Sequence, residues 1–199
     1  MSNSSSVGVP QQSSGSSTWL TLGTPEANPL ISYHYNVPFS MSFTLSQLET
    51  YGDITAICDR YKLSKVDVKF LYSANAISGT GAASAGPSML PIVNYIVDHD
   101  DAAVQTCTKI REKMGLKTKT CGPGKFVKTS LRPVPVVVSG SAGGQYIVPK
   151  QVYMNSDYPS NPHYGLKGYF ENWDLQTLAS ATSAWSIEIT YHVSCRDLQ

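Results

Sequence analysis

The main candidate for chemistry in this 199-residue chain is a concentration of basic side chains between residues 105 and 132. Its members are Lys109, Arg111, Lys113, Lys117, Lys119, Lys125, Lys128 and Arg132. Glu112 is the only acid in this stretch, so eight positive charges minus one give +7; the whole chain carries +1, which leaves −6 for the rest. Such segregated charge is typical of a surface that binds a polyanion. The alternative is a solvated helix and loop whose charges only maintain solubility.

The one acidic cluster consists of Asp98, Asp100 and Asp101, with His99 between them. Closely spaced carboxylate oxygens suit a hard cation such as calcium. The spacing is not that of an EF-hand, because no glycine or distal glutamate completes the loop. The pattern favours a solvated turn in which Asp100 or Asp101 caps the next helix. A cation held at an interface stays open as the alternative.

Catalytic motifs are absent from the sequence. It contains no G-x-S-x-G elbow, no glycine-rich phosphate loop and no H-E-x-x-H motif. The four histidines, His34, His99, His163 and His192, are scattered and include no H-x-H pair, which argues against a cupin-type metalloenzyme. We therefore expect neither enzymatic activity nor a cofactor.

The four cysteines, Cys58, Cys107, Cys121 and Cys195, form no C-x-x-C pair and have no histidine at zinc-finger spacing. We expect them to be buried free thiols in a reducing compartment. No run of about 18 apolar residues exists that would span a membrane, so no membrane partner is expected. The start of the chain lacks a basic segment followed by an apolar one, which favours synthesis without secretion, in the cytoplasm or nucleus.

Alternating apolar residues predict that the chain is mostly β-strand. The clearest strands cover residues 37–45, 66–72 and 185–195, and further strands are expected within 90–97, 125–138, 146–153 and 164–170. Pro133 and Pro135 require an edge or a bulge in the strand at 125–138. Short helices are expected near residues 48–61 and 103–114, and an exposed loop at 73–88.

The composition of the chain and the connections between its predicted strands reduce the number of possible fold classes. Charged residues make up 15% of the chain, below the roughly 25% of an ordinary soluble domain. Residues 1–18 are rich in Ser, Gly and Gln and predict a flexible arm, and residues 19–199 predict one folded domain. No regular long helices separate the strands, which excludes a parallel α/β fold. Among sandwich, barrel and jelly roll, the uneven loops with inserted helices favour an all-β single jelly roll, an eight-stranded antiparallel β-sandwich.

Several segments resemble a known family. The strand Tyr61–Phe70, which reads YKLSKVDVKF, resembles the "Y-x-I-x-K-V-x-V-x-F" segment in capsid proteins of circoviruses and related small circular single-stranded DNA viruses. Residues 152–159 are similar to the family's "D-Y-F-x-P" run, and Phe170-Glu171-Asn172 to its "F-E-N". Residues 187–193 are similar to its final strand. These segments occur in the family's order between about residues 35 and 197.

The resemblance implies a viral jelly roll and a structural role. About 60 copies would close a T=1 icosahedral shell through heterologous interfaces. The shell would enclose single-stranded DNA, contacted through its phosphates without sequence specificity. The resemblance also implies a virion component, made in the host cytoplasm and assembled there or in the nucleus. It does not identify a host receptor or glycan.

One departure from the family concerns the start of the chain. Such proteins usually begin with an Arg-rich arm that binds DNA, whereas residues 1–59 here contain no Lys or Arg. Either this chain is truncated or processed, or packaging relies on the basic residues of 105–132, or the capsid holds little nucleic acid. The departure does not affect the predicted fold, which depends on the strands.

A jelly-roll carbohydrate-binding module of the lectin kind is the alternative function. Tyr158, Tyr164 and Trp173 lie in or beside predicted loops, where aromatic rings stack on sugars. Aromatic loop residues serve subunit interfaces equally well. The absence of a secretion signal favours the capsid interpretation.

Overall fold

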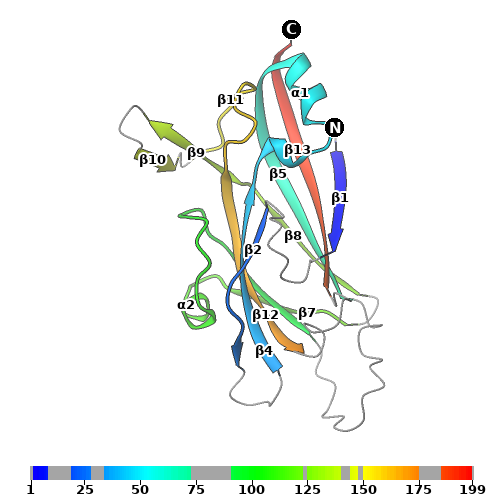
Figure 1. The fold of residues 1–199 in the computed structure, drawn as a ribbon, viewed down its shortest axis with the longest axis vertical. Helices are drawn as coiled ribbons and strands as arrows, with labels where there is room; N and C mark the ends of the chain where they lie inside the picture. Colours follow the sequence, from blue (N-terminus) through cyan, green and yellow to red (C-terminus); the bar gives the residue numbers. More distant parts are fainter. Residues whose placement is uncertain are drawn as a thin grey trace.

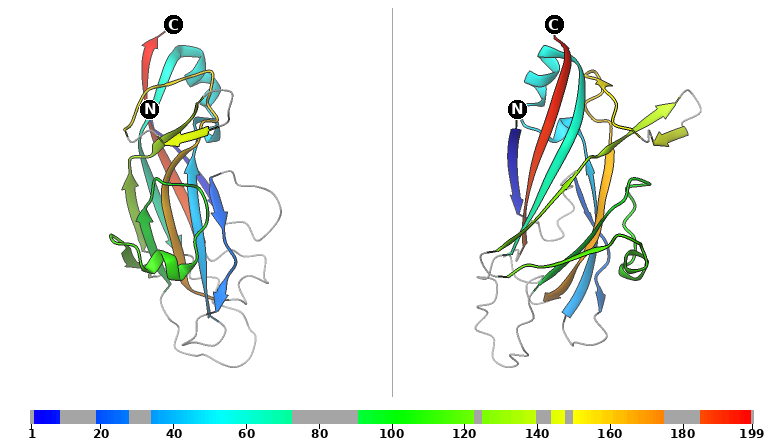
Figure 2. Two further views of the ribbon diagram at one scale, coloured as in Figure 1. Left: turned by 90° about the vertical axis from the view of Figure 1, so that its left-hand side faces the viewer. Right: turned by 180° about the vertical axis from the view of Figure 1, so that it is seen from behind.

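The computed structural model describes residues 2–8, 19–27, 34–72, 91–122, 125–139, 144–147, 150–174 and 185–198. These residues form two antiparallel sheets that pack face to face (Figures 1 and 2). The five-stranded sheet consists of β1 (Ser2–Gly8), β5 (Cys58–Tyr72), β8 (Phe126–Leu131), β11 (Met154–Asn155) and β13 (Trp185–Leu198). The eight-stranded sheet consists of β2 (Leu20–Leu22), β3 (Glu26–Ala27), β4 (His34–Phe43), β6 (Ile92–Val97), β7 (Lys117–Thr120), β9 (Val134–Ser139), β10 (Gly144–Ile147) and β12 (His163–Asp174).

The order of the strands identifies a jelly roll. In the five-stranded sheet the order is β1, β13, β5 and β8, and in the eight-stranded sheet it is β4, β12, β6 and β7. Followed along the chain, these eight strands cross between the sheets as two Greek keys require. The prediction of an all-β, eight-stranded jelly roll is confirmed. The described strands β2, β3, β9, β10 and β11 are short additions to it.

Alternating side chains decide which face of each long strand is buried. From Val37 to Phe43 in β4 and from Trp185 to Tyr191 in β13 every inward residue is buried; they are Val37, Phe39, Met41, Phe43, Trp185, Ile187, Ile189 and Tyr191. β13 pairs with β5 from Trp185 opposite Tyr72 to Leu198 opposite Cys58, with one bulge at His192/Val193. Both strands therefore bury one apolar face, as the period-two pattern predicts. The opposite face is polar, but in β4 it is buried too, at Asn36 and Ser40.

Aromatic rings from both sheets fill the centre of the core. The Phe170 ring lies 4.7 Å from Phe39 and 4.8 Å from Trp185, measured between centroids, and meets Phe70 edge to face at 5.9 Å. Rings at these separations attract one another beyond their buried area. Gly168 lets β12 approach this cluster, because a Cβ there would lie 2.6 Å from Phe39 Cζ.

The predicted strand at residues 125–138 is two strands. β8 pairs with β5 in the five-stranded sheet, while β9 pairs with β12 in the eight-stranded sheet. The break falls at Arg132 and Pro133, where proline has no N–H for a ladder bond. The prediction of one strand was therefore wrong, although the prolines did mark the interruption.

The two predicted helices are present with different ends. The first region contains helix α1 (Tyr51–Ile57), preceded by a 3-10 turn, η1 (Leu45–Gln47). The helix ends at Ile57 because β5 begins at Cys58. Helix α2 (Cys107–Arg111) is followed by a turn at Gly115, whose φ of +88° suits glycine. Met114, expected on the helix, lies in this turn and is 95% exposed.

The predicted arm and loop are only partly described. Residues 2–8 form β1, which pairs with β13 from Ser2 opposite His192 to Gly8 opposite Ser186. A strand edge can bind such a segment through backbone hydrogen bonds alone, so apolar side chains are not needed. Residues 9–18 and the predicted loop at 73–88 lie outside the described residues. The domain boundary at residue 19 stays a prediction.

The cysteine prediction is correct for two residues and wrong for two. Cys107 and Cys121 are buried free thiols. Cys58 and Cys195 instead form a disulfide, with their Cα atoms 5.7 Å apart. The two residues are 137 positions apart in sequence, so their spacing gave no indication that β5 and β13 bring them together.

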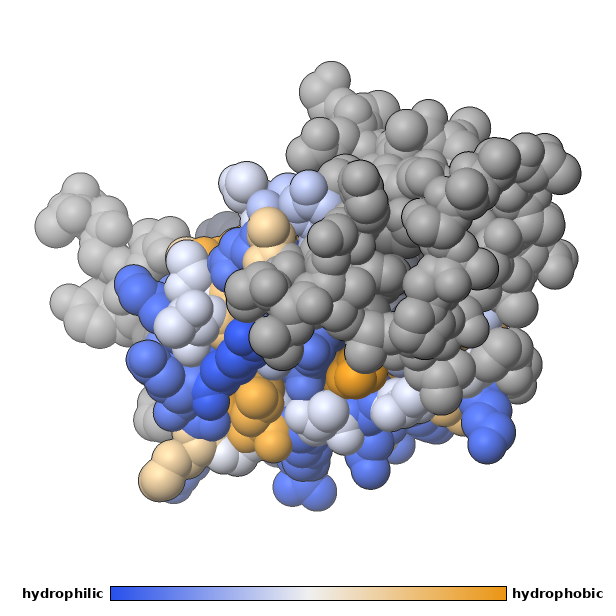
Figure 3. Space-filling model, turned by 90° about the horizontal axis from the view of Figure 1, so that it is seen from below, coloured by the Kyte–Doolittle hydropathy of each residue, from blue (hydrophilic) through white to orange (hydrophobic). Residues whose placement is uncertain are grey.

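The surface of the described residues exposes few large apolar side chains. These are Tyr51, Ile57, Val97, Met114, Phe126 and Tyr158. Seen from below, the described surface is mostly hydrophilic, with apolar residues in small separate groups (Figure 3). No helix among the described residues is long and apolar enough to cross a membrane.

Candidate nucleic-acid interface

The basic residues predicted to form one surface divide between the two sheets. Lys109 and Arg111 lie on α2, Lys113 follows it, and Lys117 and Lys119 lie on β7, which pairs with β6 in the eight-stranded sheet. The chain then crosses between sheets at Cys121, whose buried thiol donates to the carbonyls of Phe70 and Lys125.

The remaining three predicted residues accompany β8. Lys125 precedes the strand, Lys128 lies on it and Arg132 follows it, next to β5 of the five-stranded sheet. A run of eight basic residues in sequence is therefore not one surface in the fold.

Three of the eight basic residues interact within the fold. Arg111 Nε donates to the Tyr169 hydroxyl at 3.0 Å, and its guanidinium lies over the same ring at 5.1 Å from the centroid. This hydrogen bond raises the pKa of Arg111 despite partial burial. Lys113 donates to Asp98, and Lys128 Nζ lies 3.3 Å from an Asp67 oxygen. These contacts give part of the predicted charge a structural role.

The other five, Lys109, Lys117, Lys119, Lys125 and Arg132, are exposed. No ion pair joins any of them to a carboxylate of the described residues.

Helix α2, which carries Lys109, is capped by Thr106. The Thr106 side chain accepts a hydrogen bond from the Lys109 N–H at 3.4 Å. The prediction that Asp100 or Asp101 caps this helix was therefore wrong.

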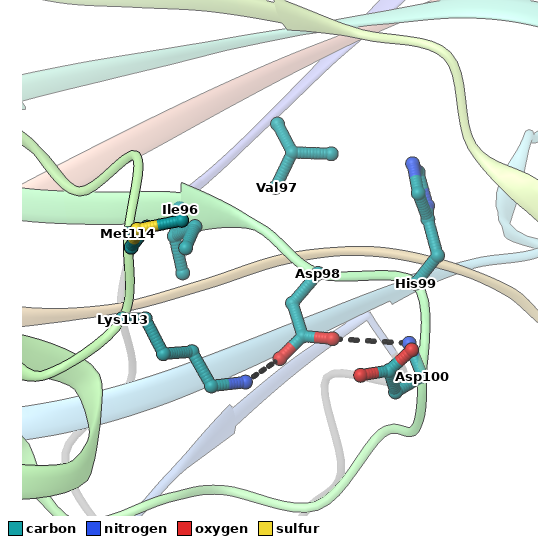
Figure 4. Close-up of a pocket in the computed structure, with 7 residues that line it drawn as sticks. All are labelled: Ile96, Val97, Asp98, His99, Asp100, Lys113 and Met114. Carbon is teal, nitrogen blue, oxygen red and sulfur yellow. Dashed lines mark hydrogen bonds and ion pairs between the residues drawn. The ribbon is translucent and has the colours of Figure 1, made fainter.

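Two carboxylates of the acidic cluster, those of Asp98 and Asp101, face ammonium groups. Lys167, 1% exposed, donates to Asp101 Oδ1 at 2.6 Å and lies 3.5 Å from Asp98 Oδ2. Asp98 also accepts from Lys113 and from the Asp100 N–H, beside an open hollow edged by Met114 (Figure 4).

Burial raises the pKa of Asp98, but the hydrogen bonds from Lys113 and the Asp100 N–H outweigh it, so the pKa is lowered overall. Lys113 and Lys167 thus supply the positive charge that a cation would supply to Asp98. The described residues contain no group of three or more His, Cys, Asp or Glu side chains placed to hold a metal ion. An interface cation at Asp98, Asp100 and Asp101 stays a prediction without support from this geometry.

A second set of basic side chains lies on the outward face of the five-stranded sheet. We call it the basic face; it consists of Arg60, Lys62, Lys65, Lys69, Lys128, Arg132 and Arg196. These residues alternate with the buried ones of β5, β8 and β13, so they share the solvent side of three adjacent strands. Asp67, Glu188 and Asp197 are its acids, and seven positive charges minus three give +4.

The acids of the basic face are paired with its cations. Asp67, at the middle strand, accepts from Ser130 and lies 2.9 Å from Lys65 Nζ and 3.2 Å from His192 Nε2. Burial alone would raise the pKa of Asp67, but these hydrogen bonds and that of Lys128 hold it well below the usual range. Asp67 thereby fixes β8, β5 and β13 together while its own charge is masked.

An aromatic ring lies among the cations at the end of this face. Lys62 Nζ is 4.8 Å and the Arg196 guanidinium 5.7 Å from the centroid of Tyr153. Proteins that bind single-stranded nucleic acids combine cations, which contact the phosphates, with aromatic rings, which stack on the bases. Sequence reasoning missed this face because its residues come from three strands far apart in the chain. The sequence pattern that could have indicated the basic face is the pair of outward lysines, Lys65 and Lys69, on β5.

Known proteins match this fold. The family model described as "Circovirus capsid protein" matches residues 11–199, while no curated protein matches. The BFDV capsid protein in its 60-mer crystal structure aligns with a TM-score of 0.51 and 13% identity, covering 98% of this chain and 91% of that chain.

Two weaker structural matches are a decameric BFDV capsid protein and Desmodium yellow mottle tymovirus. The decamer gives a TM-score of 0.44 and 12% identity over 98% of this chain and 96% of that one. The tymovirus gives 0.44 and 10% over 100% and 87%. Because these structures are only 10–13% identical to the chain, their similarity supports the fold alone. Membership of the family is shown by the family model, which matches residues 11–199. The chain belongs to the circovirus capsid protein family, and it is therefore a structural component of the virion that assembles with copies of itself.

Proposed function

We propose that this protein forms a T=1 shell of about 60 copies around single-stranded DNA, which the basic face holds through phosphate contacts without reading sequence. The family match supports the shell, as does the BFDV capsid protein, which has this fold and whose crystal structure is that of a 60-mer. The role is structural rather than catalytic. Synthesis would take place in the host cytoplasm, with assembly there or in the nucleus.

The observation that carries the DNA proposal is the net charge of +4 on the outward face of one sheet. Seven of the chain's 15 Lys and Arg residues lie on the basic face. Arg132 is exposed and pairs with no carboxylate of the described residues, so its charge is available to a ligand. Arg60, Lys128 and Arg196, whose side chains are 59%, 53% and 63% exposed, also reach solvent, although each pairs with an acid of the face. Phosphate contacts require accessible cations and no particular base. The predicted residues Lys128 and Arg132 belong to this surface.

Two matched variants separate this proposal from binding by α2 and β7. The first carries Lys62→Gln, Arg132→Gln and Arg196→Gln, which removes three charges from the basic face and leaves the ion pairs of Asp67 intact. The second removes three exposed charges from the eight-stranded sheet side, at Lys109, Lys117 and Lys119. Both should assemble, because none of the six side chains is buried.

The measurement is the nucleic-acid content of purified particles, from the ratio of absorbance at 260 and 280 nm. We expect the first variant to lose nucleic acid and the second to retain it. With dissociated subunits and oligothymidylate, losing three phosphate contacts should reduce the slope of log K against log salt by about 2. Loss only in the second variant would assign binding to α2 and β7; no loss in either would refute both sites.

A further inference from the structure

The disulfide between Cys58 and Cys195 lies where three structural elements end. Cys58 is the residue at which α1 ends and β5 begins, and it is fully buried. Cys195 lies near the end of β13 and is exposed. The bond therefore joins the end of β13 to the junction between α1 and β5. Figure 1 shows the end of β13 beside α1.

The end of β13 pairs with β5 as far as Leu198 opposite Cys58, and Arg196 lies beside the Tyr153 ring, but apart from these contacts and the disulfide its side chains are held weakly. Cys195, Arg196 and Asp197 are all exposed, so this segment buries little apolar surface. Asp197 pairs with Arg60 at 3.7 Å, but both side chains are about half exposed, and ion pairs of this kind are screened by solvent.

The backbone of the segment is also unfavourable. Asp197 has a φ of +54°, the only positive φ of a non-glycine residue among those described. This conformation costs free energy for a residue with a Cβ, although less for aspartate than for most residues. The segment from Cys195 to Leu198 would thus fray easily if the disulfide were absent.

We propose that the Cys58–Cys195 disulfide is a redox-sensitive clamp on the end of β13 and the end of α1. It is closed in oxidising surroundings and opened by low-molecular-mass thiols such as glutathione, which reducing compartments maintain. This inference does not depend on nucleic-acid binding or on the copy number of the shell.

The opening reaction is thiol–disulfide exchange. A glutathione thiolate attacks Sγ of Cys195, the exposed partner; the S–S bond breaks, and Cys58 leaves as a thiolate that takes up a proton. A second glutathione thiolate attacks the mixed disulfide, which releases Cys195 as a thiol and forms oxidised glutathione. Two electrons pass from the two glutathione thiols to the cysteine pair, and the reverse reaction closes the clamp.

The expected consequence is local. Residues of β13 before the bulge, such as Ile187, Ile189 and Tyr191, are buried and paired with β5 and do not depend on the clamp. The end of β13 and the end of α1 lose their covalent constraint. Reduction should therefore loosen one end of the subunit and leave the jelly-roll core folded.

The first test counts thiols. Particles purified without reductant are denatured with iodoacetamide present, and the intact mass gives the number of alkylated cysteines. We expect two alkylated cysteines of four, Cys107 and Cys121, and all four after treatment with glutathione. Four alkylated cysteines before reduction, even after incubation with oxidised glutathione, would overturn the proposal.

The second test is hydrogen exchange on the oxidised and the glutathione-treated protein. We expect faster exchange in peptides covering 194–199 and 51–58 after reduction, at the same level in Cys195→Ser without reductant, and no change in 36–43. Cys121→Ser is the matched control, because its hydroxyl can make the same bonds to backbone carbonyls. Equal exchange in the two states, or a uniform loss of protection over the core, would refute a local clamp.

Discussion

Acidification should destabilise the subunit through one buried histidine, His163. The residue begins β12, is 1% exposed, and packs beside Tyr61 with 6.3 Å between ring centroids. Its Nδ1 lies 3.0 Å from the Asn161 carbonyl oxygen. Desolvation by burial lowers the pKa of His163 from 6.5 to about 4, although hydrogen bonds to the backbone oxygens of Asn161 and Phe43 oppose this effect. The folded protein therefore holds this ring neutral at pH values where the unfolded chain binds a proton.

The sign and size of the effect follow from this difference. As the pH falls from 6.5 to about 4, the unfolded state takes up a proton that the folded state refuses, so the free energy of unfolding falls. The full loss is about 3 kcal/mol, since one pKa unit corresponds to about 1.4 kcal/mol. At about pH 4.5 the loss should already be about 2.5 kcal/mol.

Carboxylates act in a different range of pH. The pKa values of Asp67 and Asp98 are lowered from 3.8 in the folded state. Their contribution to stability is complete above 3.8 and is lost only as the pH falls further, through their folded pKa values. The interval between 6.5 and 4 is therefore the one in which His163 acts without them.

Urea unfolding of dissociated subunits at about pH 7 and about pH 4.5 measures the effect, because the linear extrapolation gives the free energy of unfolding at each pH. The His163→Gln variant should lose the 2.5 kcal/mol difference, since glutamine cannot titrate. His192→Gln, at the surface beside Asp67, is the matched control. An identical pH dependence in the wild type and in His163→Gln would refute the reasoning.

Two further substitutions test the packing around β12. Lys167→Met removes the buried ammonium between Asp98 and Asp101 and should cost about 1–3 kcal/mol in urea unfolding, because Asp98 keeps Lys113 and Asp101 is partly exposed. Lys113→Met, at a side chain that is 29% exposed, should cost less. Equal costs would contradict the role given to burial. Gly168→Ala puts a Cβ 2.1 Å from the Asn94 carbonyl oxygen and should destabilise the protein by about 1–3 kcal/mol, whereas Gly52→Ala meets nothing within 4 Å and should be neutral or stabilising. Melting temperatures of the two variants measure these effects. A Gly168→Ala protein as stable as the wild type would contradict the close approach of β12.

The strands that alternate strictly could be predicted because their periodicity is local. Residues 37–43 and 185–193 each show the pattern in full, and each forms the predicted strand with the predicted buried face. The uneven loops favoured the jelly roll, and the ordered family resemblance supported it and added the capsid role. Burial of one face is a property that a strand carries in its own sequence.

Features that depend on which strands become neighbours could not be predicted. Nothing near residues 125–138 indicates that β8 and β9 join different sheets. Lys167 reads as an outward, solvated residue of a strand, yet the loop that follows β6 covers it and provides Asp98 and Asp101. The disulfide and the basic face likewise require β5 beside β13, a pairing between distant segments.

The central claim, that this protein is a shell-forming capsid subunit, is tested most directly by sedimentation velocity on the purified protein, with negative-stain microscopy of the same sample. We expect one fast-sedimenting species and uniform round particles whose mass corresponds to about 60 subunits. A monomer that persists across a range of salt concentration and pH would contradict it.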